Sequence, residues 1–235
     1  MQEQKASSIN NLGLTALMEN RFAKLAPIGE ALHFLMRMVL SRLPEKARIL
    51  CVGVGTGPEL FALADAFPHW TFVAVDPAEP LLGICRKRAE ERGISSRCTF
   101  HKGYLDSLPE SGLFDAATAI LVSQFVVKQE ERRDFFRQIA RRLLPDGYLV
   151  SADLASTMSG LPYNSLLETW LRAMNYAGIP SEEVDKMLSG WGKDISVLPP
   201  QEIGSIIALS GFEAPVLFHQ ALFIHAWYAQ LRAQK

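Results

Sequence analysis

The chain has 235 residues, a formal net charge of -1 and 49% hydrophobic residues. This length and apolar content suffice for a full core, so a single domain is the first expectation. The near-neutral charge argues against a protein that binds nucleic acid backbones, since such proteins show a basic excess or a basic face.

The cysteines and the N-terminus indicate the compartment. Cys51, Cys85 and Cys98 form no CxxC pair, which predicts reduced thiols and no structural zinc site. The polar N-terminus lacks the apolar core of a signal peptide. The most apolar stretch, 31–40, is too short to span a bilayer and contains Arg37. We therefore expect a soluble, cytoplasmic protein with no membrane partner and no metal.

The first 155 residues alternate between helical and strand patterns. Helical spacing covers 11–25 and 28–43, and strands are then predicted between helices. Predicted strands lie at 48–53, 70–76, 98–103, 114–122 and 148–154, and predicted helices at 57–67, 81–93 and 129–147, with Pro145–Gly147 as a turn. This alternation predicts a parallel sheet that is covered by helices on both faces.

The alternation ends after residue 155. Residues 156–195 contain helical pieces and no clear strand, and 198–212 is a capped helix. Residues 213–231 form a long β-like stretch, which predicts a hairpin that turns near Gln220–Leu222.

A glycine-rich turn connects the first strand to its helix. Gly53, Gly55 and Gly57 allow a sharp turn and the close approach of a ligand, and Pro58 suits the first helical position. Asp76 ends the next strand, where a carboxylate accepts hydrogen bonds from a ribose diol. These features predict a nucleoside cofactor. The pattern is GxGxG rather than GxGxxG and no YxxxK pair is present, which disfavours a nicotinamide-dependent oxidoreductase.

Five segments together resemble the ordered motifs of class I S-adenosylmethionine-dependent methyltransferases of the small-molecule type. They read ILCVGVGTG, VAVDPAEPLL, HKGYLDSLP, FDAATAILV and LLPDGYLVSADL, and LPPQEIGSIIALSGFEAP is similar to the closing helix and strand. The resemblance implies an α/β, Rossmann-like, doubly wound sheet of seven mostly parallel strands with an antiparallel last strand. It also implies one methyltransferase domain with a helical cover, divided into an N-terminal cover (1–45), a cofactor-binding core (46–155), a helical insertion (156–197) and a closing helix with hairpin (198–235).

The same resemblance assigns the cofactor site. It implies that S-adenosylmethionine, with S-adenosylhomocysteine as product, lies against Gly53, Gly55, Gly57, Asp76, Pro77, Leu81, Tyr104, Leu105, Leu121 and Ser123. Two positions depart from the family, because Cys51 and Tyr104 stand where acids are common. The cofactor ammonium is then expected to be held by backbone carbonyls or water. These departures also leave a non-catalytic binding protein for the same cofactor as an alternative.

No catalytic residue is evident from the sequence. Transfer of the methyl group depends mainly on alignment with the acceptor, and an oxygen acceptor also needs a base. Asp153, at the end of the fifth strand, and His33, on the N-terminal helix, are the candidates. The other histidines are expected to have structural roles.

The acceptor is expected to be a small molecule. The stretch ILVSQFV stands where amino-methylating nucleic acid enzymes carry an (N/D)PP(Y/F) segment, so no nucleic acid partner is expected. The helical additions are rich in aromatic residues and methionine, which favours an apolar or aromatic substrate and, slightly, O-methylation. These residues are Phe22, Phe34, Met36, Met38, Tyr163, Trp170, Met174, Tyr176 and Trp191. An apolar cover would also serve as the face of a homodimer.

Overall fold

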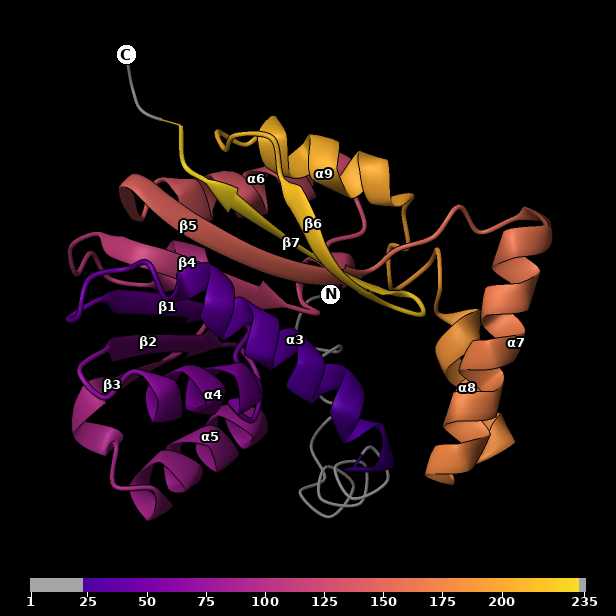
Figure 1. Ribbon diagram of the computed structural model, residues 1–235, viewed down its shortest axis with the longest axis horizontal. Coiled ribbons are helices and arrows are strands. Elements are labelled where there is room, and N and C mark those ends of the chain that lie inside the picture. The colour runs from indigo at the N-terminus through magenta and orange to yellow at the C-terminus, as the bar shows by residue number, and fades with distance from the viewer. Residues whose placement is uncertain (1–22, 233–235) are drawn as a thin grey trace.

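A computed structural model describes residues 23–232 (Figure 1). Its centre is a seven-stranded sheet with the order β3-β2-β1-β4-β5-β7-β6. Strands β1 to β5 are parallel to one another, and β7 is antiparallel to both β5 and β6. The predicted fold class, with its antiparallel last strand, is confirmed.

The strands and helices alternate along the chain up to β5. The strands are β1 (Arg48–Val52), β2 (Thr71–Asp76), β3 (Cys98–Lys102), β4 (Phe114–Ile120), β5 (Leu143–Leu154), β6 (Val216–Ala221) and β7 (Ile224–Gln230). The helices are α3 (Ala26–Leu40), α4 (Pro58–Ala66), α5 (Glu79–Glu91), α6 (Gln129–Ala140), α7 (Gly160–Ala177), α8 (Ser181–Ser189) and α9 (Pro200–Ala208). Within the described residues, no helix is both long and apolar enough to cross a membrane.

Alternate residues of β1 face two different hydrophobic cores. Ile49 and Cys51 are fully buried among residues of α3, α4 and α5, whereas Leu50 and Val52 pack with residues of α6 and α9. This period of two is the expected consequence of strand geometry when both faces of a sheet are covered. The glycine loop that follows β1 therefore emerges between two packed layers at the carboxyl edge of the sheet.

The α7–α8 pair extends beyond the carboxyl ends of the parallel strands (Figure 1). A third apolar cluster attaches it to the sheet, with the fully buried Phe223 of the β6–β7 turn at its centre. The Phe223 ring lies 4.9 Å from Trp191, 5.7 Å from Trp170 and 5.9 Å from Tyr163, measured between ring centroids. These tilted and edge-to-face pairs add to the free energy gained from apolar burial.

The predicted boundary between the helix at 129–147 and the strand that follows it is wrong. The predicted helix at 129–147 ends at Ala140, and β5 already begins at Leu143. Pro145, Asp146 and Gly147 belong to an irregularity of β5, where the register with β4 shifts and Asp146 has a φ of 62°. The predicted hairpin is present, and its turn is formed by Leu222, which has a φ of 53°, and Phe223, next to the predicted position near Gln220–Leu222. Of the predicted helix at 11–25, residues 11–22 lie outside the described residues, and 23–25 form the short helix η2 (Ala23–Leu25).

Replacing Phe223 should detach the α7–α8 cluster from the sheet. We expect Phe223→Ala to lower the free energy of unfolding by about 3–5 kcal/mol, the usual cost of removing a buried phenylalanine. Leu161→Ala, at a side chain that is 83% exposed, is the control and should change it by less than about 0.5 kcal/mol. Urea unfolding followed by tryptophan fluorescence measures both, and equal effects of the two changes would contradict this assignment.

Candidate cofactor site

The glycine loop turns back over the end of β2. The Gly53 and Val54 amides both donate to the Val75 carbonyl, at 2.7 and 3.2 Å. A β-carbon at Gly53 would meet Val122 Cγ2 at 2.4 Å, so this glycine is required by packing. Gly55 has a φ of 54°, and among residues 23–232 a β-carbon there would meet no atom within 4 Å apart from its chain neighbours. Gly55 therefore leaves an open space beside the loop into which a ligand can fit.

Asp76 holds the loop in place. Its carboxylate accepts hydrogen bonds from the Gly55 amide and the Ala78 amide, both at 2.8 Å. The side chain is buried, which raises its pKa, although the two amides partly oppose this effect. Each carboxylate oxygen keeps acceptor capacity beyond these bonds. Asp76 thus lies beside the open space at Gly55 and can still accept hydrogen bonds from a ribose diol.

The residues predicted to border adenosine are placed around Asp76. Pro77 is exposed directly after it, and Leu81 is half-buried on α5. The Gly103 amide donates to the Asp76 carbonyl at 3.1 Å, which brings the exposed Tyr104 to the same edge. Leu105, unlike Pro77, Leu81 and Tyr104, has its side chain in the second core. Its carbonyl accepts a hydrogen bond from Arg142.

Leu121 and Ser123 lie at the end of β4, next to the glycine loop. The contact between Val122 and Gly53 brings the two loops together. Leu121 is half-buried, has a φ of 57° and donates its amide to the Ala152 carbonyl. Ser123 is fully buried, and its hydroxyl is engaged in hydrogen bonds with protein groups.

Asp153 belongs to a buried ion pair. Its Oδ2 lies 3.2 Å from Arg132 Nη2, and both side chains are fully buried. The Ser123 hydroxyl and the Gln124 amide also donate to this carboxylate, at 2.8 and 2.9 Å. A carboxylate with this set of partners stabilises the structure around β4, β5 and α6, and we assign it no proton transfer.

His33, the second candidate base, lies on α3. It is half-buried, and burial together with the charge of Arg37 lowers its pKa. The imidazole is therefore neutral at pH 7 and can accept a proton. Within the described residues, no three side chains of His, Cys, Asp or Glu are grouped as a metal site.

Glu59 has a buried carboxyl group that was not predicted from the sequence. It is the second residue of α4 and is only 3% exposed. Burial raises its pKa to about 8, and the nearby charge of Asp76 contributes to this rise. A signal was available in the sequence, because Glu59 lies four positions before the apolar Leu63 and so shares its face of α4.

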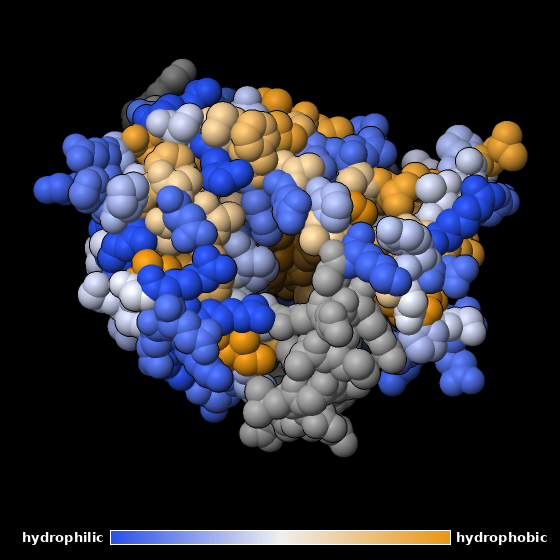
Figure 2. All heavy atoms as spheres, turned by 60° about the horizontal axis from the view of Figure 1, so that its bottom comes forward, coloured by the Kyte–Doolittle hydropathy of each residue, from blue (hydrophilic) through white to orange (hydrophobic). Residues whose placement is uncertain are grey.

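A hollow lies between the sheet and the α7–α8 pair. Figure 2 shows its apolar floor, at the side where the parallel strands end. The predicted cover residues Trp170, Met174 and Trp191 are buried in the third cluster. Phe34, Met38 and Tyr176 are exposed, and Phe22 lies outside the described residues.

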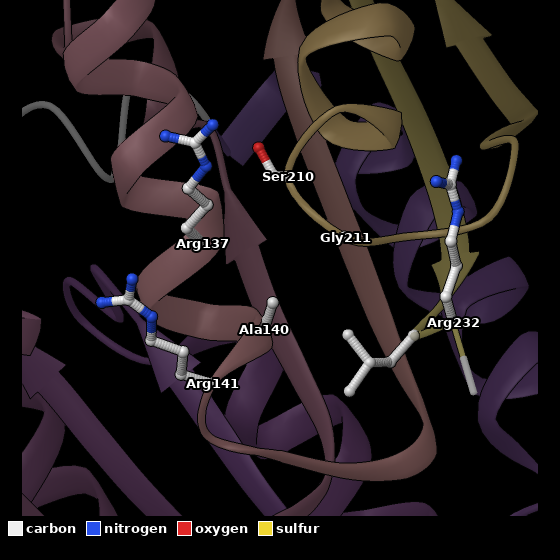
Figure 3. A pocket seen from close by; sticks show the side chains of 7 residues that line it. Arg137, Ala140, Arg141, Ser210, Gly211 and Arg232 are labelled. Atoms are coloured by element: carbon white, nitrogen blue, oxygen red, sulfur yellow. The ribbon is translucent and has the colours of Figure 1, made fainter. Parts of the chain in front are cut away.

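A separate pocket of about 300 Å³ is found at the opposite edge of the sheet. It lies at the ends of α6, α9 and β7, and Figure 3 shows Arg137, Arg141 and Arg232 around it. Arg137 pairs with Asp134 and Arg232 with Glu213. Because β5 begins at this edge, the pocket is remote from the glycine loop and is not part of the cofactor site.

Comparison with known proteins finds methyltransferases that resemble part of this chain. Residues 49–147 match the model of a methyltransferase domain family. A demethylmenaquinone methyltransferase of Thermus thermophilus is 32% identical over 142 residues, which is 55% of this chain and 62% of that protein. A release factor glutamine methyltransferase of Coxiella burnetii is 34% identical over 79 residues, 33% of this chain and 28% of that protein.

A solved structure shares the fold. An O-methyltransferase family 2 protein from Planctomyces limnophilus, in complex with apigenin, superposes with a TM-score of 0.60 at 18% identity, covering 91% of this chain and 61% of that one. This chain spans less than two thirds of the length of each of these three proteins. Residues 49–147 thus resemble a methyltransferase domain, and the chain shares the fold of an O-methyltransferase family 2 protein.

The raised pKa of Glu59 predicts how the free energy of unfolding changes with pH. Its pKa is 4.5 when unfolded and about 8 when folded, so the unfolded state loses the proton first as the pH rises. The free energy of unfolding of the wild type should then fall between these values, by roughly 1.4 kcal/mol per pH unit at most.

Glu59→Gln should remove this contribution, so the variant should gain stability over the wild type between pH 5 and pH 8. Urea unfolding without cofactor at both pH values measures the difference. Glu202→Gln, in the first turn of α9 at an exposed position, is the matched control and should show no such trend. A pH-independent difference for Glu59→Gln would contradict the account.

Proposed function

We propose that the chain transfers the methyl group of S-adenosylmethionine to a small apolar or aromatic molecule, with O-methylation favoured. The observation that carries the proposal is the open space at Gly55 beside the buried carboxylate of Asp76. It lies at the carboxyl edge of the sheet, and the hollow with an apolar floor opens on that side (Figure 2).

The residues present fit the cofactor. When bound, S-adenosylmethionine supplies an electrophilic methyl group on sulfur. Asp76 would accept hydrogen bonds from the ribose hydroxyls, and the backbone around Gly55 would contact the part of the cofactor next to the ribose. Pro77, Leu81 and Tyr104 would border the adenosine, with Leu121 on the acceptor side. Leu105 and Ser123 would act through their backbone and through the packing of their loops, because their side chains are buried.

The proposed acceptor class follows from the hollow. An apolar floor contributes binding energy to an apolar ring and excludes water from the reacting atoms. Alignment in such a site is the main contribution of the protein to methyl transfer. Demethylmenaquinone, in the name of one relative, and apigenin, bound to a protein of the same fold, are aromatic small molecules of this kind.

His33 is the base that we propose for an oxygen acceptor. It is the candidate base that remains, because Asp153 is committed to Arg132. A neutral histidine can remove the hydroxyl proton as the methyl group is transferred.

Turnover separates this proposal from the non-catalytic alternative. We expect S-adenosylhomocysteine to form when the chain and S-adenosylmethionine are incubated with phenols or hydroquinones, and not with amines or tRNA. His33→Gln should lower kcat by about 100-fold or more while cofactor binding is unchanged. His69→Gln, at an exposed histidine before β2, is the control. Cofactor binding without turnover on any acceptor would favour the non-catalytic alternative.

A further inference from the structure

The chain enters and leaves the α7–α8 pair at one place on the carboxyl edge of the sheet. Ser156, which follows β5, donates its amide to the Leu198 carbonyl, shortly before α9, at 2.9 Å. Two residues before Leu198, the Ser196 peptide is bound on both sides. Its amide donates to the Gln124 carbonyl at 2.7 Å, and its carbonyl accepts a hydrogen bond from Arg132 Nη1 at 3.3 Å. The segment that returns from the α7–α8 pair is therefore held by Gln124 and Arg132 as well as by the third cluster.

Arg132 connects this returning segment to the loop that follows β4. Its Nε donates to the Ser123 hydroxyl at 2.8 Å, and its Nη2 lies 3.2 Å from Asp153 Oδ2. Ser123 directly follows Val122, whose side chain a β-carbon at Gly53 would meet. One guanidinium group thus contacts both a loop that packs against the glycine loop and the segment that returns from the α7–α8 pair.

Stability alone does not explain a charged group at this position. Arg132 is fully buried near the amino-terminal end of α6, where the helix dipole disfavours a positive charge. A buried ion pair usually adds little to the free energy of folding compared with apolar residues of the same volume, because desolvation of the two charges offsets their attraction. The planar guanidinium instead provides fixed geometry, with its donors directed at Ser123, Asp153 and Ser196 at once.

We propose that Arg132 is a positioning residue for methyl transfer, an inference that rests on the proposed function. It holds the segment after α8 in a fixed place relative to the loop after β4. Trp191 and Val197, on that segment, belong to the third cluster, which attaches the α7–α8 pair beside the hollow. The cofactor is proposed to bind against the glycine loop and the acceptor in the hollow, so Arg132 fixes the two substrates relative to each other. Because it is fully buried, it acts through these segments.

Two variants interrupt the connection in different ways. Arg132→Lys keeps a positive charge beside Asp153 but lacks the planar group that also reaches Ser123 and Ser196. Ser196→Pro removes the amide that donates to the Gln124 carbonyl and leaves Arg132 and Asp153 in place. An effect shared by both variants is therefore not an effect of a changed Asp153.

Hydrogen exchange measured by mass spectrometry is the first readout. In both variants the amides of residues 190–198 should exchange about 10-fold faster than in the wild type, because a hydrogen bond that holds this segment is lost. The amides of β1 should keep their rate. Arg137→Lys, on the same helix and paired with the exposed Asp134, is the matched control and should change neither segment.

Methyl transfer is the second readout, measured on the phenol or hydroquinone that the wild type methylates fastest. Both variants should lower kcat by about 100-fold, since a small misplacement of the acceptor has this effect on an aligned reaction. The affinity for S-adenosylhomocysteine, measured by calorimetry, should stay within about twofold of the wild type. A role in stability alone would not separate kcat from cofactor affinity.

Four results would overturn the inference in different ways. Unchanged exchange at residues 190–198 in both variants would show that Arg132 does not hold this segment, and the proposed function would stand. Equally faster exchange in β1 would show that Arg132 only stabilises the fold. Faster exchange at residues 190–198 with an unchanged kcat would show that the segment does not align the acceptor. Binding of S-adenosylhomocysteine by the wild type without turnover on any acceptor would overturn the proposed function together with this inference.

Discussion

The hydrogen bonds that Asp76 accepts from the Gly55 and Ala78 amides fix the candidate site. They tie the end of β2 to the loop that follows β1, and both bonds are 2.8 Å long. The loop can reach the carboxylate only because Gly55 adopts a left-handed conformation, which side chains other than glycine disfavour. The same turn leaves space beside Gly55, so one constraint produces both the anchor and the opening for a ligand.

Three buried carboxyl groups at this edge of the sheet are stabilised in different ways. Asp76 is held by backbone amides, and Asp153 is held by Arg132, Ser123 and Gln124. Glu59 is held within the described residues by its own backbone amide, and burial raises its pKa to about 8. Since an uncompensated buried charge is costly, Glu59 keeps its proton at pH 7.

Much of the core was predictable from local patterns. The apolar runs, the three glycines and the spacing to Asp76 together indicate β1, its loop and β2, because local geometry alone requires these residue types. The irregularity of β5 at Pro145–Gly147 was not predictable. Proline and glycine at these positions are as typical of a turn after a helix as of an irregular strand. The Arg132–Asp153 pair joins residues 21 positions apart in the chain on different elements, and only tertiary structure brings them together. The burial of Glu59 is likewise a property of packing, although its place on an apolar helix face was a usable signal.

The measurement that tests the central claim most directly is a calorimetric titration of S-adenosylhomocysteine and NAD into the wild type, Gly55→Ala and Gly93→Ala. Both glycines have a positive φ and open space around an added β-carbon, so each alanine should cost a similar amount, roughly 1–2 kcal/mol of stability. If the cofactor occupies the space beside Gly55, Gly55→Ala should abolish binding of S-adenosylhomocysteine, Gly93→Ala should retain it, and NAD should bind to none of the three. Equal binding by the two variants, or binding of NAD alone, would contradict the account.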